Sequence, residues 1–381
     1  MKSRVAVVTC EGYFYPRVLE AVKRGIDLLG GIAQFAAPDE NILLKPNLLA
    51  GEAPEKAVTT HPAVFKAVAQ VFKEAGANVS FGDSPGLAQP QRAAAKAGLY
   101  EAAQELSVPL ADFRDGQWVP FPEAKISKTL KIASGVLACD GLVSLPKLKT
   151  HGFTRLTGAI KNQFGCIPGL VKGEYHVKMP DTFDFSRVLV ELNRFLNPRL
   201  FIMDAIIAME GNGPRSGDPT PVKALLFSTD PAAVDATACR LIHLDPRHVP
   251  YLPIAREEKL GTYLPEEIEL LGDDIAPLIR KDFKVVRKPP HRYASAKDFP
   301  TFLKSLITPK PVIDYSVCIR CGECVKICPV KDKALNWDSE EKDRKPVYNY
   351  DLCIRCYCCQ EICPSRAITV KVPLLGRIIH R

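Results

Sequence analysis

Apolar and polar positions alternate in two different rhythms along the first 290 residues of the chain. Short apolar runs predict buried strands, and longer segments with apolar residues three and four positions apart predict helices between them. The predicted strands are Val5–Val8, Ile42–Leu44, Val79–Phe81, Leu142–Leu145, Leu200–Met203 and Ala224–Phe227, and the predicted helices are Val18–Leu29, Ala63–Ala75, Phe185–Leu196 and Ala232–Ile242. This alternation predicts an α/β fold, with a largely parallel sheet and flanking helices.

Polar, turn-prone residues follow four of the predicted strands. In a parallel sheet, ligands bind beyond the carboxyl ends of the strands, so these residues are candidates for one shared site. A solvated turn or a helix cap is the alternative for each segment taken alone. The segments are Lys45–Asn47, Gly82–Gly86, Pro146–His151, and Asp204 followed by Glu210–Pro214.

One stretch, from Gly141 to Gly173, contains no acidic residue although it is rich in cations, glycines and threonines. This composition is typical of a loop that lets backbone amides and cations approach an anion. The stretch therefore predicts a site for a carboxylate or a phosphate, with a solvated surface as the alternative. Its cations are Lys147, Lys149, Arg155, Lys161 and Lys172.

Five side chains from these segments are candidates for catalytic roles. Lys147, Lys149 and Lys161 would hold the anion, and His151 or Asp83 would handle a proton. Two lysines precede His151 closely in the sequence, which disfavours protonation of the imidazole and suits it to act as a base. An ordinary loop histidine is the alternative for His151, and a helix cap is the alternative for Asp83.

Several other polar or reactive side chains have simpler explanations. Asp83, Asp204 and Asp235 could hold a metal, or could cap helices and pair with the lysines. Asp230 precedes a proline and a helical pattern, which is an N-cap signature, and His61 precedes a helix expected to begin at the next residue. Four cysteines are expected to be buried as small apolar residues, namely Cys10, Cys139, Cys166 and Cys239.

Composition changes the picture near the C-terminus, where nine of the 13 cysteines fall between Cys318 and Cys363. Two runs share the spacing C-x2-C-x2-C-x3-C-P, and their equivalent cysteines are 35 positions apart. This regularity indicates an internal duplication of one small unit. The first run is Cys318, Cys321, Cys324 and Cys328 followed by Pro329, and the second is Cys353, Cys356, Cys359 and Cys363 followed by Pro364.

The spacing suits a pair of cubane iron–sulfur clusters. Two-residue gaps let a tight loop present three thiolates to one cube, and the fourth cysteine points away to the other cube. Zinc sites usually pair C-x-x-C knuckles, and disulfides are disfavoured by the odd number of cysteines in a presumed cytoplasmic chain. The prediction is two 4Fe-4S clusters, one held by Cys318, Cys321, Cys324 and Cys363 and the other by Cys353, Cys356, Cys359 and Cys328.

With these two runs, residues from about 310 to 372 resemble the bacterial two-cluster ferredoxin family, which implies a small α+β C-terminal domain. Cys358 has no place in the spacing and is expected not to be a ligand, and Lys331–Lys345 is expected to form a surface loop. Proline clusters upstream mark a linker, within which Phe299–Ile307 could form a short docking helix. The predicted parts are an α/β domain (1–290), the linker (291–307), the ferredoxin-type domain (308–372) and a basic tail (373–381).

Seven short motifs occur in order in the α/β part: Lys45–Asn47, Thr60–Pro62, Gly82–Gly86, Pro146–His151, Thr157–Asn162, Glu210–Pro214 and Asp230–Asp235. With these motifs the first 290 residues resemble a prokaryotic family catalogued as domain of unknown function 362. Members of that family often carry a C-terminal ferredoxin module. The resemblance implies no particular activity, but it favours one shared site built from the strand-end loops.

The formal net charge of +8 is weak support for a nucleic-acid partner, because no binding motif accompanies it. Each oxidised cluster with its four thiolates would also contribute a charge of roughly −2 to the ferredoxin-type domain. The sequence has neither a P-loop nor a G-x-G-x-x-G fingerprint, which argues against an NTPase or a Rossmann dinucleotide site. It also lacks an apolar stretch long enough for a membrane span or a secretory signal, so a cytoplasmic location is expected.

Two functions from different classes fit these observations. The first is an iron–sulfur oxidoreductase that receives electrons from a partner protein and passes them to a small anionic metabolite bound in the α/β domain. The alternative is a non-enzymatic electron carrier or assembly factor that docks a redox partner protein. A third option is a redox-neutral enzyme whose clusters are structural or regulatory.

Overall fold

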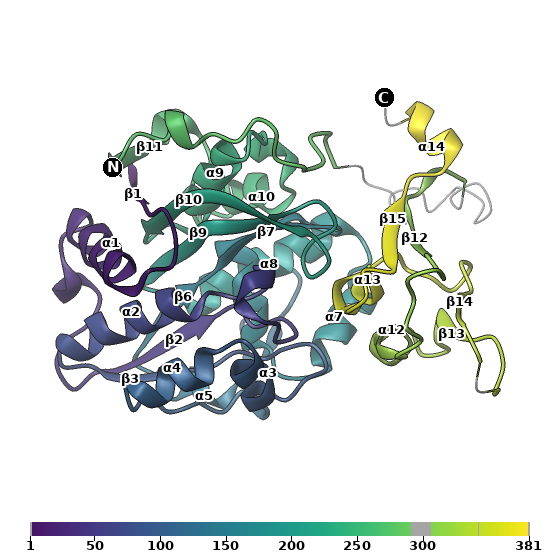
Figure 1. Ribbon diagram of the computed structural model, residues 1–381, viewed down its shortest axis with the longest axis horizontal. Helices are drawn as coiled ribbons and strands as arrows, with labels where there is room; N and C mark the ends of the chain where they lie inside the picture. The colour runs from purple at the N-terminus through teal and green to yellow at the C-terminus, as the bar shows by residue number, and fades with distance from the viewer. Residues whose placement is uncertain (1, 291–305, 342, 380–381) are drawn as a thin grey trace.

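The computed structural model describes residues 2–290, 306–341 and 343–379. The predicted helix over Phe299–Ile307 falls outside the described residues except for Leu306 and Ile307, which are both helical. A central sheet with helices on both faces is built from the first 290 residues. A smaller cysteine-rich module packs against the end of this sheet toward which β7 and the β9–β10 hairpin point (Figure 1).

The central sheet has nine strands and is mixed but mostly parallel. Seven strands follow the order β11-β1-β10-β9-β6-β2-β3, and β7 pairs with both β9 and β8. The pairs β1–β11, β9–β6, β6–β2 and β2–β3 are parallel. Strand β10 is antiparallel to both of its neighbours, β1 and β9. The strands are β1 (Ser3–Thr9), β2 (Asn41–Pro46), β3 (Asn78–Phe81), β6 (Gly141–Leu145), β7 (Lys147–His151), β8 (Arg155–Thr157), β9 (Leu200–Glu210), β10 (Asp218–Ser228) and β11 (Ile268–Gly272).

Side chains of the strands alternate between two cores, one on each face of the sheet. In β1, for example, Val5 and Val7 belong to one core, and Ala6 and Val8 to the other. Burial on both faces explains why the strands read as continuous apolar runs. The first core also includes residues of α6 (Ala159–Asn162), α8 (Thr182–Leu196), α9 (Pro231–Leu241) and α10 (Tyr251–Glu257), and the second includes residues of α1 (Tyr15–Leu28), α2 (Pro62–Glu74), α3 (Pro90–Lys96) and α4 (Leu99–Glu105).

The predicted α/β fold is confirmed, and each of the predicted strands and helices is present with slightly different ends. Asp230 caps α9 as predicted, because its carboxylate accepts hydrogen bonds from the amides of Ala232 and Ala233. His61 likewise precedes α2, which begins at Pro62, and its imidazole accepts a hydrogen bond from the amide of Ala63. Of the four scattered cysteines, Cys10, Cys166 and Cys239 are buried and Cys139 is half-buried.

Two segments predicted as loops at strand ends are strands. Residues Lys147–His151 form β7, and β9 continues beyond Asp204 to Glu210. The prediction was wrong because these polar residues are buried with internal partners, such as the ion pair between Lys147 and Asp204, instead of facing water. Elements that the apolar pattern did not predict also include β4 (Gly116–Pro120), β5 (Thr129–Ala133), α5 (Ser134–Leu137) and α7 (Val171–Lys178).

The cysteine-rich module is built from two short helices and two small antiparallel sheets of two strands each. Its outer strands, β12 (Lys310–Ile313) and β15 (Ile368–Lys371), pair antiparallel, and α12 (Glu323–Ile327) packs on α13 (Cys358–Ile362). The expectation that Lys331–Lys345 forms a surface loop is corrected in part. A short strand lies within this segment, and the buried side chain of Leu335 anchors it. The remaining elements are β13 (Leu335–Trp337), β14 (Pro346–Tyr348) and, in place of the expected tail, α14 (Leu374–Ile379).

The tip of the β9–β10 hairpin holds the module through hydrogen bonds to its backbone. Asn212 donates to the carbonyl of Ile368 at 3.0 Å, and Ser216 donates to the carbonyl of Cys363 at 3.1 Å. In return, Gln360 of α13 donates to the carbonyl of Gly213 at 2.9 Å. The Glu210–Pro214 segment, predicted to form part of a ligand site, therefore serves mainly as a docking element.

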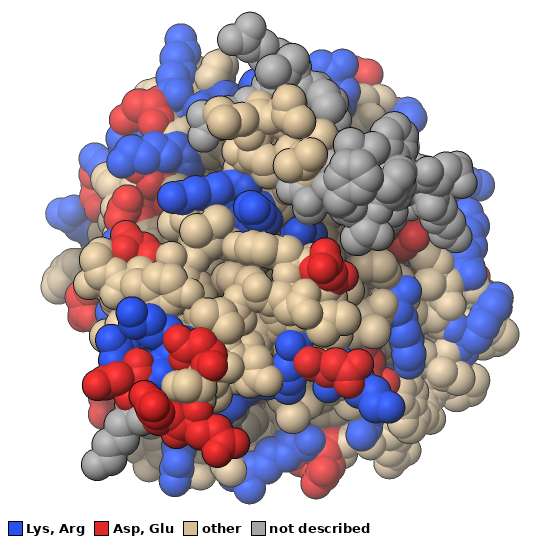
Figure 2. All heavy atoms as spheres, turned by 90° about the vertical axis from the view of Figure 1, so that its right-hand side faces the viewer, with Lys and Arg blue, Asp and Glu red and all other residues tan. Residues whose placement is uncertain are grey.

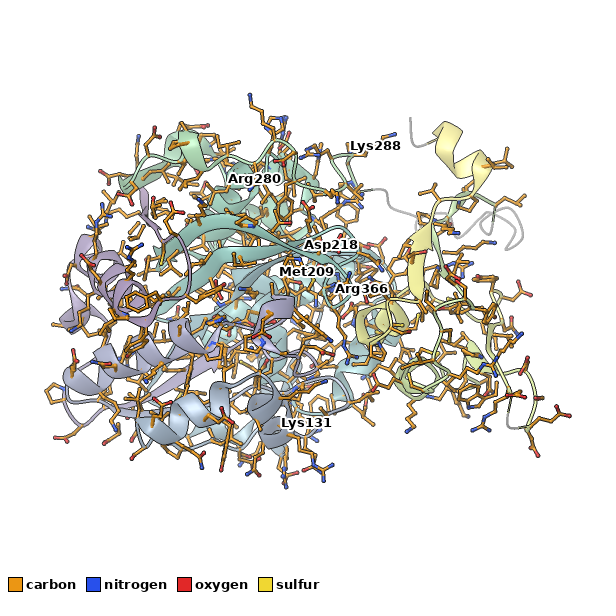
Figure 3. The ribbon with its side chains drawn as sticks, viewed as in Figure 1. Lys131, Met209, Asp218, Arg280, Lys288 and Arg366 are labelled. Carbon is orange, nitrogen blue, oxygen red and sulfur yellow. The ribbon has the colours of Figure 1, made fainter. Side chains whose placement is uncertain are left out.

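Ion pairs reinforce the same contact. The guanidinium of Arg215 is buried between Glu52 of the α/β domain and Glu323 of α12. Its Nε lies 2.9 Å from a carboxylate oxygen of Glu52, and its Nη1 lies 3.0 Å from one of Glu323. A second, exposed pair joins Asp218 to Arg366 at 3.0 Å (Figure 3). These contacts fix the module to the end of the sheet where the polar strand-end residues lie.

Candidate functional site

A cavity of about 320 Å³ lies between the strand-end residues and the module. We call it the interdomain cavity, and it is lined on one side by Lys149, Lys161 and Lys172 and on the other by Cys328, Cys358 and Glu361. Several predicted site residues thus meet at one place, together with a cysteine of the first run. Leu170 and Glu174, which are exposed, also line it and mark its side toward solvent.

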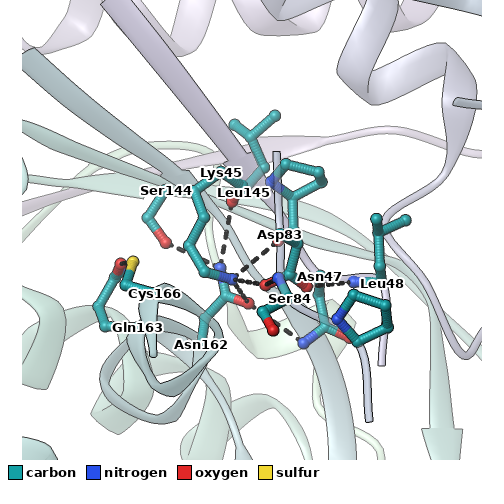
Figure 4. A network of polar contacts seen from close by, with 12 residues as sticks. Lys45, Asn47, Leu48, Asp83, Ser84, Ser144, Leu145, Asn162, Gln163 and Cys166 are labelled. Atoms are coloured by element: carbon teal, nitrogen blue, oxygen red, sulfur yellow. Dashed lines mark hydrogen bonds and ion pairs between the residues drawn. The ribbon is translucent and has the colours of Figure 1, made fainter. Parts of the chain in front are cut away.

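Beneath the cavity, a buried polar network joins the ends of β2 and β3 to α6 (Figure 4). Lys45 Nζ lies 2.8 Å from Asp83 Oδ1 and 3.1 Å from Asn162 Oδ1, and Asn162 Oδ1 also accepts a hydrogen bond from Asn47. The other carboxylate oxygen of Asp83 accepts a hydrogen bond from the amide of Leu48 at 2.7 Å. Because the ion pair and the amide engage both of its oxygens, Asp83 is placed to fix these loops, and the predicted proton-handling role does not fit it.

Lys149 is the cation most deeply set in the cavity wall. Its Nζ donates to Asn47 Oδ1 and to the carbonyl of Val58, both at 2.7 Å, and its side chain is fully buried. Burial, with the nearby Lys161 and Lys147, holds the pKa of Lys149 well below its usual value. Both hydrogen-bond acceptors are neutral, so an anionic ligand would supply the charge that this ammonium group lacks.

Lys147 does not belong to the site, contrary to the prediction. Its Nζ lies 2.7 Å from Asp204 Oδ2 and 2.8 Å from the hydroxyl of Tyr13, and it does not line the interdomain cavity. The two charges neutralise each other inside the sheet. Pairing with the lysines was one alternative for Asp204, and the structure confirms it. Sequence spacing could not tell which lysine is the partner, because Asp204 lies on another strand, β9.

Lys161 and Lys172 complete the cationic wall. Lys161 Nζ lies 5.9 Å from the ring centroid of Phe164, and among the described residues it forms no ion pair within 4.0 Å of a carboxylate. Lys172 Nζ lies 2.8 Å from Ser84 Oγ and 3.3 Å from the carbonyl of Ile167. Burial lowers the pKa of Lys172 to about 7, so this side chain is poised to exchange a proton near neutral pH.

His151 is not available as the base that the sequence suggested. Its Nδ1 accepts hydrogen bonds from the amides of Phe153 and Thr154, at 3.0 and 3.2 Å. Its Nε2, which must then carry the proton, lies 2.9 Å from Glu361 Oε1 of α13. Burial lowers the pKa of His151 to about 4, and the two contacts leave neither nitrogen free to take a proton from a substrate.

Three buried polar atoms in the cavity wall have no hydrogen-bond partner among the described residues. One is Glu361 Oε1, which still forms an ion-pair contact of 2.9 Å with His151 Nε2, and the other two are Thr157 Oγ1 and His176 Nδ1. The imidazole of His176 stacks on Phe185 with ring centroids 4.4 Å apart, and burial lowers its pKa to about 4. Because leaving such an atom unpaired costs about 1–3 kcal/mol, the atoms of Thr157 and His176 both favour a polar ligand in the cavity.

Asp204 and Asp235, which the sequence left as possible metal ligands, make structural contacts instead. Asp204 pairs with Lys147, and Asp235 accepts hydrogen bonds from the amides of Ala159 and Ile160 at the start of α6. Burial raises the pKa of Asp235 to about 7. Among the described residues, no three His, Cys, Asp or Glu side chains are gathered closely enough for a single metal ion.

The cysteine runs form two equivalent loops followed by α12 and α13. Arg320 and Arg355, which occupy equivalent positions, are both left-handed, with φ of 54° and 60°. The next equivalent pair, Gly322 and Tyr357, is also left-handed, and the ring of Trp337 lies where a Cβ at Gly322 would be. These shared backbone conformations make the tight turns that the C-x2-C-x2-C spacing requires.

Several thiols of the two runs lie close enough to influence one another's pKa. Burial, and then the thiolates of Cys321, Cys363 and Cys318, raise the pKa of Cys324 to about 12. Burial, and then the thiolate of Cys356, raise the pKa of Cys359. The hydroxyl of Tyr348 donates a hydrogen bond to the sulfur of Cys359 at 3.2 Å. The donor chemistry fits cubane clusters, whose corners hold ligands farther apart than one metal ion does.

These features define the class of protein. The sequence profile of a 4Fe-4S dicluster domain matches residues 313–367, so the chain is an iron–sulfur protein of the electron-transfer type. The profile described as Domain of unknown function (DUF362) matches residues 42–240, and the chain belongs to this family.

Relatives and solved structures add the following likenesses. A thylakoid-associated protein from Synechocystis is 35% identical over 262 residues, which are 68% of this chain and 80% of that protein. The lactate racemase apoprotein from Thermoanaerobacterium thermosaccharolyticum matches with a TM-score of 0.39 at 15% identity, over 63% of this chain and 56% of that one. A structural-genomics protein from Thermotoga maritima matches with a TM-score of 0.40 at 12% identity, over 58% of each chain.

The described residues include no helix that is both long and apolar enough to cross a membrane. Of the residues that line the cavity, Lys172 and Thr157 were placed by sequence in the cation-rich stretch but were given no role of their own. Sequence reasoning missed His176 and Glu361. They carried no local signal, because their place depends on how α7 and the module pack.

Proposed function

We propose that the protein is an iron–sulfur reductase that passes electrons to a small anionic molecule bound in the interdomain cavity. One observation carries the proposal: the buried Lys149, the half-buried Lys161 and Lys172 and a cysteine of the cluster-binding runs, Cys328, line the same cavity. The volume of about 320 Å³ suits a small organic acid or a phosphate compound.

The eight regularly spaced cysteines would hold two 4Fe-4S clusters, in the crossed sets that the spacing predicts. When bound, each cluster exchanges one electron at a time, and two clusters can together supply the pair that most organic reductions need. Cys358 lines the cavity next to Cys359 and is left outside both sets. The fit rests on the two equivalent left-handed loops and on the thiols gathered around Cys324.

The cavity wall divides the remaining work among its polar side chains. Lys149 and Lys161 would hold the anion, and Thr157 and His176 would satisfy their unpaired atoms on its polar groups. A reduced protein electron carrier loses two electrons, and the bound substrate gains these electrons and two protons. Lys172 would supply one proton through Ser84, and solvent at the open side of the cavity would supply the second.

The test is a binding screen on the anaerobically purified, reduced holoprotein, with inorganic phosphate and a panel of two- to five-carbon carboxylates as probes. Lys161→Ala should weaken binding of the best anion by tenfold or more, because it removes a cation from a largely desolvated wall. Lys178→Ala, an exposed lysine on α7, is the matched control and should bind normally. Equal binding by both variants would contradict the proposed site.

The alternative of a non-enzymatic carrier or assembly factor is tested by the same experiment. If no anion binds and the reduced protein transfers its electrons only to another protein, the carrier function replaces the reductase. The unpaired atoms of Thr157 and His176 and the neutral hydrogen-bond acceptors of Lys149 favour a bound anion, and with it the reductase.

A further inference from the structure

The first cysteine loop presents apolar side chains to solvent on the outward face of the module. Ile319 is 64% exposed and Val317 is 47% exposed, and Cys321 between them and α12 is exposed as well. Figure 2 shows this side of the molecule, where uncharged surface occupies the middle and charges gather around it. Apolar side chains grouped near one reactive position mark a protein-interaction surface more often than a solvated one.

The second loop shows what such a face is for. Its equivalent positions are covered in part: Leu352 is 38% exposed, whereas Ile354 is half-buried and Cys356 is 8% exposed. On this side α13 and the α/β domain are joined through Gln360 and Glu361. One loop of the duplicated unit therefore has its protein partner within the chain, and its counterpart presents the same kind of surface without one among the described residues.

Charge identifies the partner of the first loop. A hollow of about 320 Å³ beside Cys321 is lined by the cations Arg320, Lys326 and Arg344, and none of the described carboxylates lines it. Arg344 is held in place by stacking on Trp337, with its guanidinium carbon 4.4 Å from the ring centroid. Arg320 also pairs with Asp343 at 3.1 Å, but that aspartate is 96% exposed, so water screens the pair.

The position equivalent to Lys326 makes the charge argument specific. In the second loop this position is Glu361, whose carboxylate meets His151 of the α/β domain at 2.9 Å. The sign of the charge is reversed in the first loop, where Lys326 lines the hollow and also the edge of the interdomain cavity. A partner that docks on the first loop must therefore bring carboxylates, in the place where the α/β domain brings an imidazole and lysines.

We propose that the outward face around Cys321, with its hollow of three cations, docks an acidic protein electron carrier whose redox group is surrounded by carboxylates. This inference rests on the proposed electron-transfer function and names its partner. Docking there brings the carrier's redox group next to Cys321, an exposed cysteine of the first set. Electrostatic steering by such a surface raises association rates by about 10- to 1,000-fold.

The test is anaerobic stopped-flow reduction of the holoprotein, with no substrate present, by a reduced acidic flavodoxin. Lys326→Glu combined with Arg344→Glu should lower the second-order rate constant at least tenfold at low salt, and wild-type reduction should slow as salt is raised. Lys281→Glu, an exposed lysine of the α/β domain, introduces an acidic side chain elsewhere and should change the rate by less than twofold. Reduction by dithionite, which needs no docking surface, should be unchanged in all variants.

Two outcomes would overturn the inference. One is a flavodoxin rate that the double variant and added salt leave unchanged, and the other is an equal slowing with flavodoxin and dithionite. Lys326→Gln provides a milder change if the double variant loses iron, and it should still slow flavodoxin reduction about threefold with full iron content. Because no substrate is present, failure here is separate from failure of the anion-binding proposal.

Discussion

The two cysteine loops have the same spacing and the same left-handed turns, yet their surroundings are opposite. Cys321 of the first loop is exposed, whereas its equivalent in the second, Cys356, is 8% exposed. The second loop leads into α13, which is held by the β9–β10 hairpin, and the first borders a cationic hollow on the outer face. The local sequence determines the conformation of each loop, and the surrounding parts of the protein determine what that loop can contact.

The comparison also explains why a duplicated unit carries different residues at equivalent positions. Glu361 pairs with His151, and Lys326 at the equivalent position faces the hollow. In the same way, Glu323 binds Arg215, while the equivalent Cys358 lines the interdomain cavity. The shared residues hold the turn and the thiols, and those that differ are the ones that contact other parts of the molecule.

The largest expected effect tests which cysteines act together. Cys328→Ala should remove about half of the eight irons, because this cysteine of the first run is assigned to the second set. Cys358→Ala, which removes a buried thiol from the same region, should keep all of them. Iron analysis and electron paramagnetic resonance of the reduced proteins measure both results. Full iron content in the Cys328 variant would refute the crossed assignment.

The next effect concerns the ion pair that ties the first loop's helix to the α/β domain. Arg215→Ala leaves Glu52, which is 2% exposed, with only Lys56 and Lys96 as partners. We expect the free energy of unfolding to fall by roughly 3 kcal/mol, at the low end for a broken buried pair because those lysines remain. Chemical denaturation measures the loss, and the exposed Arg17→Ala is the control. An equal, small change in both variants would show that the pair does not hold the module.

A smaller effect is the pH dependence of the second loop's contact. The pKa of His151 is lowered by burial to about 4 from an ordinary 6.5, so the unfolded protein binds a proton that the folded protein does not. The stability that this group contributes is therefore fully present above pH 6.5 and is lost as the pH drops toward 4. The free energy of unfolding falls by up to about 1.4 kcal/mol per pH unit on account of this group. Glu361, whose pKa is lowered by His151 and Lys161 despite its burial, adds a further loss below about pH 4.5.

His151→Gln isolates that contribution. Between pH 7.5 and 5.5 the variant should lose roughly 1 kcal/mol less unfolding free energy than the wild type, since glutamine does not titrate. His243→Asn replaces an exposed histidine and should lose as much as the wild type does. Denaturation curves at the two pH values give the comparison, and identical losses in all three proteins would exclude the buried neutral imidazole.

The smallest effect belongs to the exposed pair at the edge of the docking contact. Asp218 and Arg366 lie 3.0 Å apart, and their side chains are 56% and 51% exposed. Asp218→Asn should change the unfolding free energy by about 0.5 kcal/mol or less, because water and salt screen the pair. A loss of several kcal/mol in denaturation experiments would mean that the rim, and not Arg215, holds the module in place.

Much of this arrangement could be predicted from the sequence. Apolar runs located the strands because both faces of the sheet are covered, and the repeated cysteine spacing identified the cluster-binding unit. Lys149, Lys161 and Lys172 were placed in one cation-rich stretch, and all three line the interdomain cavity. Composition alone could find them because no acidic residue separates them.

The rest depended on contacts between distant parts of the chain. Lys147 was assigned to the anion, but Asp204 on β9 neutralises it. His151 was assigned as a base, but Glu361, 210 positions later, and two backbone amides occupy its nitrogens. No local pattern reports such partners, since they meet only when the strands pair and the module docks.

The central claim is that the second loop faces a bound anion while the first faces an external electron carrier. The most direct test is a redox titration of the holoprotein followed by electron paramagnetic resonance, with and without the best-binding anion. The signal that Cys328→Ala abolishes should shift to lower potential when the anion binds, the other signal should stay, and Lys161→Ala should remove the shift. A shift of the other signal alone, or no shift despite saturating binding, would contradict the account.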